Sequence, residues 1–274
     1  ALALETPEQQ MLAATMLAVP NENYLFEQMR GFDVDALLDA RDAAVENAAQ
    51  AHVQTWEALV AMHDSGQAYQ ADASGMARRA LGNTAFSYLA KTQTGAVLEE
   101  LLQTRYAKAD NLTDRRTVLA IACRHTGVSE AFKDSLLEDF YQAWKDYALV
   151  IDLWFNLQAQ SPLITIDGLR ALEAHPDFDA KNPNRARADY AAFGMLNNRK
   201  FHQLDGSGYE FLSDVIMRLD ALNPQMASRL TTPLTRMGRY DVTRQRLMRK
   251  QLTRMSESST LSSDLYEIVI KSLA

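Results

Sequence analysis

The polar residues most able to do chemistry lie between Asn182 and Arg236, where helix starts are well marked. Asparagine followed by proline occurs at Asn182 and again at Asn223. Asparagine accepts a hydrogen bond from a free backbone N–H at a helix start, and proline has no N–H to leave unpaired. Arg187 lies five residues after Asn182, and Arg229 lies five residues after Pro224. Helices that start sharply hold their side chains in fixed directions, so we expect these two arginines to be aimed at one place.

A further helix start is predicted between these two. The run Ser207-Gly208-Tyr209-Glu210 has the pattern of a capping box, in which serine and glutamate satisfy each other's backbone donors. The residues before it, Asp205-Gly206, make the stretch resemble a phosphate-binding loop. Such a loop needs a preceding strand and a lysine that are both missing here. We therefore predict a tight turn that leads into a capped helix.

The histidines lack the spacing of a helical zinc peptidase, which needs two histidines four residues apart with a glutamate beside the first. None of them has another histidine three to five residues away, and none is followed by glutamate. We expect each to be a structural histidine on a partly buried face, and we predict no metal site within this chain. They are His52, His63, His125, His175 and His202.

Nucleophilic catalysis is not favoured either. Cys123 is the single cysteine, so the chain forms no internal disulfide, and a reducing, cytoplasmic location is expected. Cys123 and His125 stand two residues apart on a predicted helix and point to different faces, which favours a core role for the cysteine. No serine–histidine–aspartate order and no carboxylate pair stands out. We predict no catalytic residue in this chain.

The charge balance is acidic overall and basic in one segment. The net charge is −7 and the pI is near 5.3, which argues against a nucleic-acid partner. Residues 228–254 nevertheless carry eight basic side chains against one acid, Asp241. A nucleic-acid-binding helical module stays an alternative, but we favour a solvated face or salt bridges to neighbouring helices. The basic residues are Arg229, Arg236, Arg239, Arg244, Arg246, Arg249, Lys250 and Arg254.

The elements that must position these residues are almost all helices. No apolar run approaches the roughly 20 residues that a bilayer requires, so no membrane partner is expected. Apolar residues recur at helical spacing throughout, and one long helix is expected from Asp33 to an end at Asp64-Ser65-Gly66. Consecutive helices with short loops form antiparallel pairs, and stacked pairs give a superhelical α-solenoid of armadillo or HEAT type. One irregular helical bundle is the alternative fold.

Several stretches resemble one known family. They are NPNRARADYAAF, FHQLDGSGYEFL, LNPQMASRLTTPLTR, RYDVTRQRLMR and LSSDLYEIVIKSLA, with LAVPNENYLFEQM, ADNLTDRRTVL and DLWFNLQAQSP earlier in the chain. Together they resemble the C-terminal helical domain of bacterial aminopeptidase N, an alanyl aminopeptidase of the gluzincin zinc metallopeptidases. The resemblance covers essentially the whole chain and is most specific over its last hundred residues.

This resemblance implies a role without a catalytic centre. In the family, the helical domain closes over a thermolysin-like catalytic domain and leaves a channel for peptides. The HExxH motif and the distal glutamate that hold zinc there are missing here. The resemblance therefore implies that residues 1–274 are one helical C-terminal domain, a fragment lacking the domain's first helices and the catalytic domain. Its implied partners are the catalytic and N-terminal domains and peptide substrates, and the isolated chain should be inactive and should tend to self-associate.

The resemblance also implies three substrate-binding residues. The second arginine of NPNRAR is Arg187, and the glutamine and arginine of NPQMASRL are Gln225 and Arg229. In the family, the matching residues contact the substrate beyond the scissile bond, for which the guanidinium donors suit a carboxylate or a peptide carbonyl. The alternative is that both arginines pair with acids inside the solenoid. A free-standing solenoid that binds peptides or proteins is the alternative function.

Overall fold

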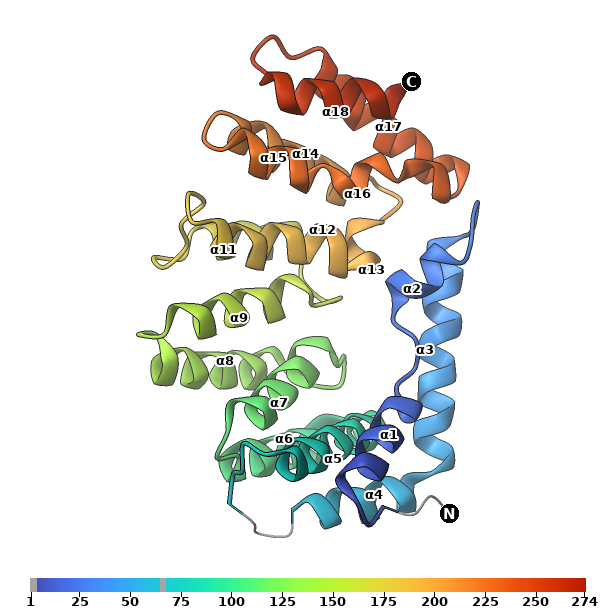
Figure 1. Ribbon diagram of the computed structural model, residues 1–274, viewed down its shortest axis with the longest axis vertical. Coiled ribbons are helices and arrows are strands. Elements are labelled where there is room, and N and C mark those ends of the chain that lie inside the picture. Colours follow the sequence, from blue (N-terminus) through green and yellow to red (C-terminus); the bar gives the residue numbers. More distant parts are fainter. Residues whose placement is uncertain (1–3, 65–67) are drawn as a thin grey trace. The chain divides into compact units, whose positions relative to one another are not determined.

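The computed structural model describes residues 4–64 and 68–274, and these ranges fold into helices joined by short loops (Figure 1). Within these ranges there is no β-strand, and one isolated bridge joins Phe32 to Tyr240. The predicted all-α fold is therefore confirmed. No helix in the described ranges is long and apolar enough to cross a membrane. Ser65 and Gly66, where the long helix was expected to stop, lie outside the described residues.

The chain divides into two compact units. The first contains Ala1–Pro20 and Asp39–Phe140, and the second contains Asn21–Leu38 and Tyr141–Ala274. Two helices, α3 (Val34–Ala51) and α8 (Glu130–Trp144), contribute residues to both units.

The first unit is built around α5 (Ala73–Lys91). Trp56 of α4 stacks on Tyr88 of α5 with ring centroids 4.5 Å apart, and its indole N–H donates to the Ala49 carbonyl at 3.1 Å. The Tyr88 hydroxyl donates to the Leu17 carbonyl at 2.7 Å, which ties α1 to the same core. The other helices of this unit are α1 (Pro7–Leu17), α4 (Val53–His63), α6 (Gly95–Lys108) and α7 (Leu112–Arg124).

The single long helix expected from Asp33 is wrong, because the structure divides it into α3 and α4 at His52. His52 leaves the helical region with φ −131° and ψ 31°. The bond from the Trp56 indole to the Ala49 carbonyl satisfies an acceptor that a continuous helix would use in its own ladder. Apolar spacing continues across the break, so the pattern alone does not reveal it.

Residues 148–274 of the second unit form a stack of short helical layers, seen from yellow-green to red in Figure 1. The elements of the second unit are α2 (Glu22–Glu27), α9 (Ala148–Ala159), α10 (Ile166–Glu173), α11 (Pro183–Ala186), the π turn η1 (Arg187–Ala191), α12 (Ala192–Leu196), α13 (Asn198–Phe201), α14 (Ser207–Asp220), α15 (Pro224–Leu230), α16 (Thr232–Thr235), the 3-10 turn η2 (Met237–Arg239), α17 (Val242–Ser256) and α18 (Ser263–Leu273). Here α14 packs on α15 and α17, and α18 packs on both α15 and α17.

Arg244 of α17 joins the beginning of the second unit to its end. Its side chain is 1% exposed and donates to Asp35 at 2.6 Å, to Asp241 at 2.7 Å and to the His202 carbonyl at 2.9 Å. A buried guanidinium is tolerated when carboxylates and carbonyls satisfy its donors, as here. Arg254 pairs with Asp214 at 2.7 Å. These contacts bear out, for these two arginines, the salt bridges expected of the basic segment.

The predicted capping box at Ser207 is wrong. The first residue outside α14 is Gly206, which has a left-handed φ of +77°, and no side chain caps the helix. The Ser207 N–H and hydroxyl instead donate to Asp205 Oδ1 at 2.9 and 2.7 Å, as in an aspartate turn. Gly208 is needed for a close approach, because a Cβ there would lie 2.5 Å from the Phe201 carbonyl oxygen.

Candidate functional site

Arg187 is positioned by the helix start predicted at Asn182. The Asn182 side chain accepts hydrogen bonds from the backbone N–H of Asn184 and Arg185, which confirms the predicted cap. Arg185 turns inward, where its Nε donates to Asp152 at 2.6 Å and its guanidinium lies over the Phe155 ring at 4.7 Å. The first arginine of the motif therefore anchors the segment, and the second, Arg187, is left at the surface.

The Arg187 side chain is exposed and folds back on its own turn. Its Nε donates to the Pro183 carbonyl at 3.0 Å, and its Nη2 donates to Asn184 Oδ1 at 2.8 Å. No ion pair within residues 4–64 and 68–274 involves Arg187. Since a guanidinium carries five N–H donors, most of its donors stay available to a ligand.

Gln225 and Arg229 share one face of α15. Asn223 caps this helix by accepting from the Met226 N–H at 3.1 Å, which confirms the second predicted cap. Residues four apart on a helix are neighbours, so Gln225 and Arg229 stand side by side, and both are exposed. In the part of the chain that the structure describes, neither side chain has a hydrogen bond or an ion pair. Whether Arg187 converges on the same spot stays a prediction.

A residue that the sequence analysis did not single out lies next to Arg187. Asp189 sits inside the π turn η1, is 0% exposed, and has no hydrogen-bond partner on either carboxylate oxygen. Burial, aided by the nearby charge of Glu173, raises the pKa of Asp189 to about 8. A single aspartate within a helical run carries no sequence signal of this burial. The π turn itself is a local departure from α-helix that often occurs near functional sites.

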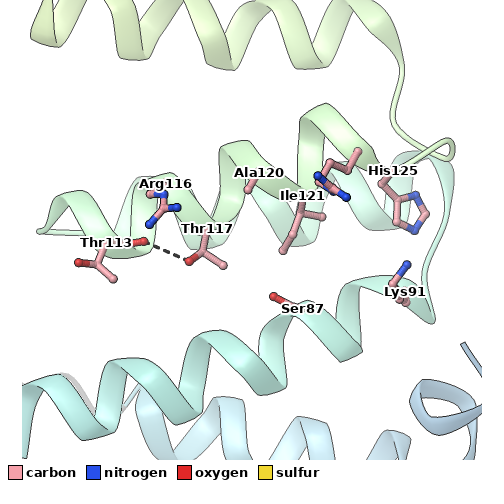
Figure 2. Close-up of a pocket in the computed structure, with 9 residues that line it drawn as sticks. Ser87, Lys91, Thr113, Arg116, Thr117, Ala120, Ile121 and His125 are labelled. Atoms are coloured by element: carbon pink, nitrogen blue, oxygen red, sulfur yellow. Dashed lines mark hydrogen bonds between the residues drawn. The ribbon is translucent and has the colours of Figure 1, made fainter. Parts of the chain in front are cut away.

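A cavity of about 440 Å³ opens between α5 and α7 in the first unit (Figure 2). We call it the α5–α7 cavity. Lys91 of α5 and His125, directly after α7, lie at one end, and Arg116 lies toward the other (Figure 2). Sequence reasoning placed no site here, because the lining residues come from two helices and become neighbours only after folding.

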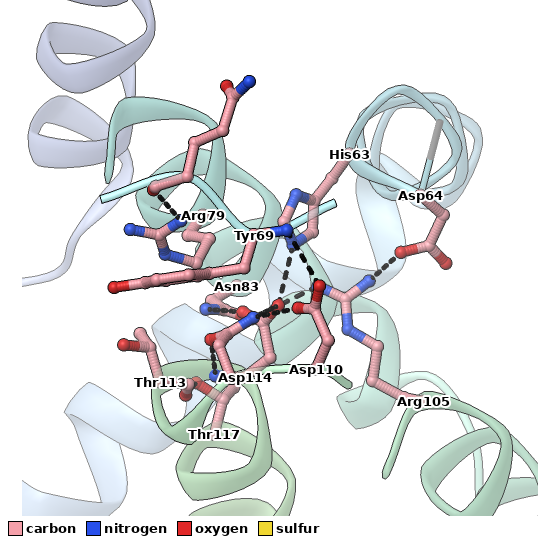
Figure 3. Close-up of polar contacts among 12 residues, drawn as sticks. His63, Asp64, Tyr69, Arg79, Asn83, Arg105, Asp110, Thr113, Asp114 and Thr117 are labelled. Atoms are coloured by element: carbon pink, nitrogen blue, oxygen red, sulfur yellow. Dashed lines mark hydrogen bonds and ion pairs between the residues drawn. The ribbon is translucent and has the colours of Figure 1, made fainter. Parts of the chain in front are cut away.

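A polar network holds α4, α5, α6 and α7 together (Figure 3). Asp114 accepts from Asn83 at 2.7 Å and from Asn111 at 2.9 Å, and lies 3.6 Å from His63 Nε2. Arg105 donates to Asp64 at 2.5 Å and to Asn83 Oδ1 at 3.2 Å. Each helix of this group therefore contributes at least one member of the network.

The electrostatics of this network favour a structural role. Burial alone would raise the pKa of Asp114, but the bonds from His63, Asn111 and Asn83 outweigh burial and hold its pKa well below its usual range. Gly82 lets the His63 ring lie against α5, because a Cβ there would come 2.2 Å from the ring. Asp114 is thus a permanent anion that fixes the helices around it.

The remaining candidates from the sequence are mostly structural. Burial raises the pKa of the Cys123 thiol to about 12, and its side chain is 1% exposed, so the predicted core role is confirmed. Burial lowers the pKa of His202 to about 3, and its Nδ1 lies 2.8 Å from the Tyr209 hydroxyl. His52 is exposed rather than partly buried, because it stands at the break between α3 and α4. Among the described residues, no group of three His, Cys, Asp or Glu side chains could hold a metal ion.

The chain is similar to known aminopeptidases. Aminopeptidase N of Haemophilus influenzae is 37% identical over 263 residues, which cover 96% of this chain and 30% of that protein. Aminopeptidase N of Escherichia coli is 34% identical over 277 residues, which cover 100% of this chain and 31% of that protein. The crystal structure of Legionella pneumophila aminopeptidase A in complex with aspartic acid matches with a TM-score of 0.85 and 27% identity, over 96% of this chain and 31% of that one.

The chain therefore spans about 30% of the length of the curated relatives it matches. A family model described as "Domain of unknown function (DUF3458_C) ARM repeats" matches residues 1–274. The expected armadillo-type architecture and the resemblance to the C-terminal helical domain of bacterial aminopeptidase N are both confirmed. The chain belongs to the DUF3458_C family of ARM-repeat domains.

Proposed function

We propose that this chain is the helical part of a zinc-dependent aminopeptidase, in which it caps the active-site chamber and lines the channel for peptides. The observation that carries the proposal is the family match over residues 1–274 together with the similarity to aminopeptidase N over about 30% of that enzyme. Peptide substrates and the other domains of the same enzyme are its proposed partners. A reducing, cytoplasmic location accords with one buried cysteine.

The zinc of such an enzyme does not fit the residues of this chain. The described residues offer no group of three ligating side chains, whereas a catalytic zinc site takes three protein ligands. We therefore assign the metal and the hydrolytic step to residues outside this chain. The contribution proposed for this chain is to bind and orient the peptide.

The residues proposed for that contribution are Arg187, Gln225 and Arg229. All three are exposed, and their donors are not consumed by carboxylates of the described chain. Arginine donors in a fixed fork suit the carbonyls and the terminal carboxylate of a peptide beyond the scissile bond. Contacts to residues beyond the scissile bond strengthen binding only for substrates that have such residues.

This dependence on the substrate gives a direct test in the longer polypeptide that contains this domain. We expect Arg187→Ala and Arg229→Ala to raise KM for trialanine about tenfold, the loss expected for one charge-assisted hydrogen bond. The alanyl arylamide has no peptide beyond the scissile bond, so its kinetics should stay unchanged. Steady-state kinetics on both substrates measures the difference.

Arg246→Ala is the matched control, since Arg246 is an exposed arginine of α17 to which no role is assigned. It should leave both substrates unaffected. Equal losses on trialanine and on the arylamide would contradict the proposal, because they would mean that the arginines support folding rather than the peptide.

The 274-residue chain on its own offers a second check. Elemental analysis should find no stoichiometric zinc, and the same sample should not hydrolyse an alanyl arylamide. Stoichiometric zinc with turnover would overturn the assignment of the metal and the hydrolytic step to residues outside this chain.

A further inference from the structure

The α5–α7 cavity has the size and lining of a small-molecule site. Its volume of about 440 Å³ lies within the range of ligand pockets, roughly 300 to 1,000 Å³. Ala120 and Ile121 supply apolar surface on the α7 side (Figure 2). A ligand with a short carbon skeleton could therefore bury apolar area there while its polar groups meet the rim.

The charged side chains that line the cavity are all basic. Lys91, Arg116 and Arg124 line it, and no aspartate or glutamate is among its lining residues. In the described part of the chain, Lys91 and Arg116 have no hydrogen bond or ion pair through their side chains. The chain as a whole has a net charge of −7, so this local excess of cations is not a consequence of composition.

His125 adds a neutral donor to these cations. Its Nδ1 accepts a hydrogen bond from the Gly127 N–H at 3.0 Å, so the ring proton of the neutral imidazole is on Nε2. Burial and the nearby charge of Lys91 outweigh the opposing charge of Glu46 and lower the pKa of His125, so the neutral ring predominates near pH 7. An N–H donor therefore lines the same end of the cavity as the Lys91 ammonium (Figure 2).

Two of the three hydroxyls that line the cavity are already engaged with their own helices. Thr117 donates to the Thr113 carbonyl at 3.1 Å, and Ser87 donates to the Asn83 carbonyl at 2.8 Å. These bonds leave the Ser87 and Thr117 oxygens as weak acceptors, so the donors that a ligand would meet are the cations, the histidine and the Thr113 hydroxyl. Such a set of donors suits anionic oxygens.

We propose that the α5–α7 cavity binds a small organic dianion, whose two negative charges are carried by one phosphate or by two carboxylates. The two cations that have no partner among the described residues, Lys91 and Arg116, match a doubly charged ligand better than a singly charged one. The cavity lies wholly within the first unit, whereas Arg187, Gln225 and Arg229 belong to the second. Failure of this proposal would therefore leave the proposed function of those residues untouched.

Isothermal titration calorimetry on the 274-residue chain tests the proposal. The probes are inorganic phosphate, glycerol 3-phosphate and succinate, each at constant ionic strength, with acetate as the singly charged comparison. We expect at least one dianion to bind at least tenfold more tightly than acetate. A preference for the phosphates identifies a phosphate ligand, and a preference for succinate identifies a dicarboxylate.

The variant that tests the cations is Lys91→Gln combined with Arg116→Gln. Each exposed ion pair contributes a factor of up to about five in affinity, so the double variant should bind the preferred dianion roughly tenfold more weakly. Arg246→Gln makes the same kind of charge change on α17 and should leave affinity unaltered. Far-ultraviolet circular dichroism checks that all variants keep the helical content.

An independent readout locates the ligand. In nuclear magnetic resonance titrations, the amide signals of Thr117 and Ile121 should move in the unaltered chain, and the double variant should need roughly tenfold more ligand for the same change. The proposal is overturned if no dianion binds more tightly than acetate. It is equally overturned if the double variant binds the preferred dianion as tightly as the unaltered chain, or if the shifted signals lie outside α5 and α7.

Discussion

At the scale of single residues, side chains of the same type differ in burial and in their partners. Arg185 and Arg187 are two positions apart, yet Arg185 is 5% exposed and paired with Asp152, whereas Arg187 is at the surface. Removing the partner of a buried arginine destabilises the fold, whereas replacing an exposed arginine mainly affects the binding of ligands. The assignment of Arg187 rather than Arg185 to the peptide therefore has a physical reason.

Asp189 leads to a prediction about pH. Its folded-state pKa of about 8 lies above the ordinary value of 3.8, so the folded chain keeps a proton there that the unfolded chain releases between these values. Stability should therefore fall as pH rises from about 4 to about 8, by up to about 1.4 kcal/mol per pH unit from this group. Asp189→Asn removes the titration and should be increasingly more stable than the parent toward pH 8.

Chemical denaturation at a series of pH values measures this difference. Asp146→Asn serves as the control, because Asp146 is exposed and its replacement should leave the pH dependence of the parent unaltered. If Asp189→Asn and the parent show the same slope of stability against pH, the carboxyl group is not held protonated in the folded chain.

At the scale of elements, helix starts were predictable where their signal is local. Asn182 and Asn223 both cap the helices expected of them, because a capping side chain and its N–H partners lie within three residues. The break at His52 was not predictable, because it depends on how Trp56 packs in the core.

The candidate site was predictable in part for the same reason. Capping fixed where Arg187 and Arg229 would stand, but the α5–α7 cavity and the network around Asp114 join residues from different helices. Nothing in the spacing of Lys91 and Arg116 indicates that they line one cavity. Non-local neighbours of this kind follow from packing, which a single sequence does not display.

Gly208 gives an element-scale prediction about how α14 docks on α13. A Cβ at Gly208 would lie 2.5 Å from the Phe201 carbonyl oxygen and 2.7 Å from that of Lys200, and neither backbone atom can move without shifting α13. Gly208→Ala should therefore lower the free energy of unfolding by about 2–3 kcal/mol, as overpacked sites do. Thermal or urea denaturation measures the loss.

Gly238 provides the matched control. A Cβ at Gly238 would meet nothing within 4 Å, and its φ is not in the left-handed region. Gly238→Ala should change stability by less than about 0.5 kcal/mol. Equal stability of the two variants would show that α14 tolerates displacement from α13.

At the scale of the whole molecule, α1 exposes apolar side chains near the beginning of the chain. Met11, Leu12 and Met16 are 38%, 56% and 66% exposed. In the proposed enzyme, other domains of the same polypeptide would cover this face. We expect the 274-residue chain alone to self-associate at high concentration, because clustered exposed apolar residues favour association.

Light scattering over a concentration series tests this expectation. Leu12→Lys with Met16→Lys should shift the chain toward the monomer, since charge opposes burial of this face. Val242→Lys is the control, because Val242 is 81% exposed on α17, away from α1 in the sequence. A strictly monomeric chain at high concentration would contradict the expectation.

The contact between Arg244 and Asp35 also has a consequence for synthesis on the ribosome. These residues are 209 positions apart, so Asp35 is synthesised roughly 10 to 40 s before Arg244 at ordinary elongation rates. Asp39–Phe140 emerges entirely within that interval, free to acquire structure while Asn21–Leu38 remains without its final neighbours. A nascent chain stalled before residue 195 would carry this early segment without its contacts to Met195, Asn198 and Arg244, open to proteases and chaperones.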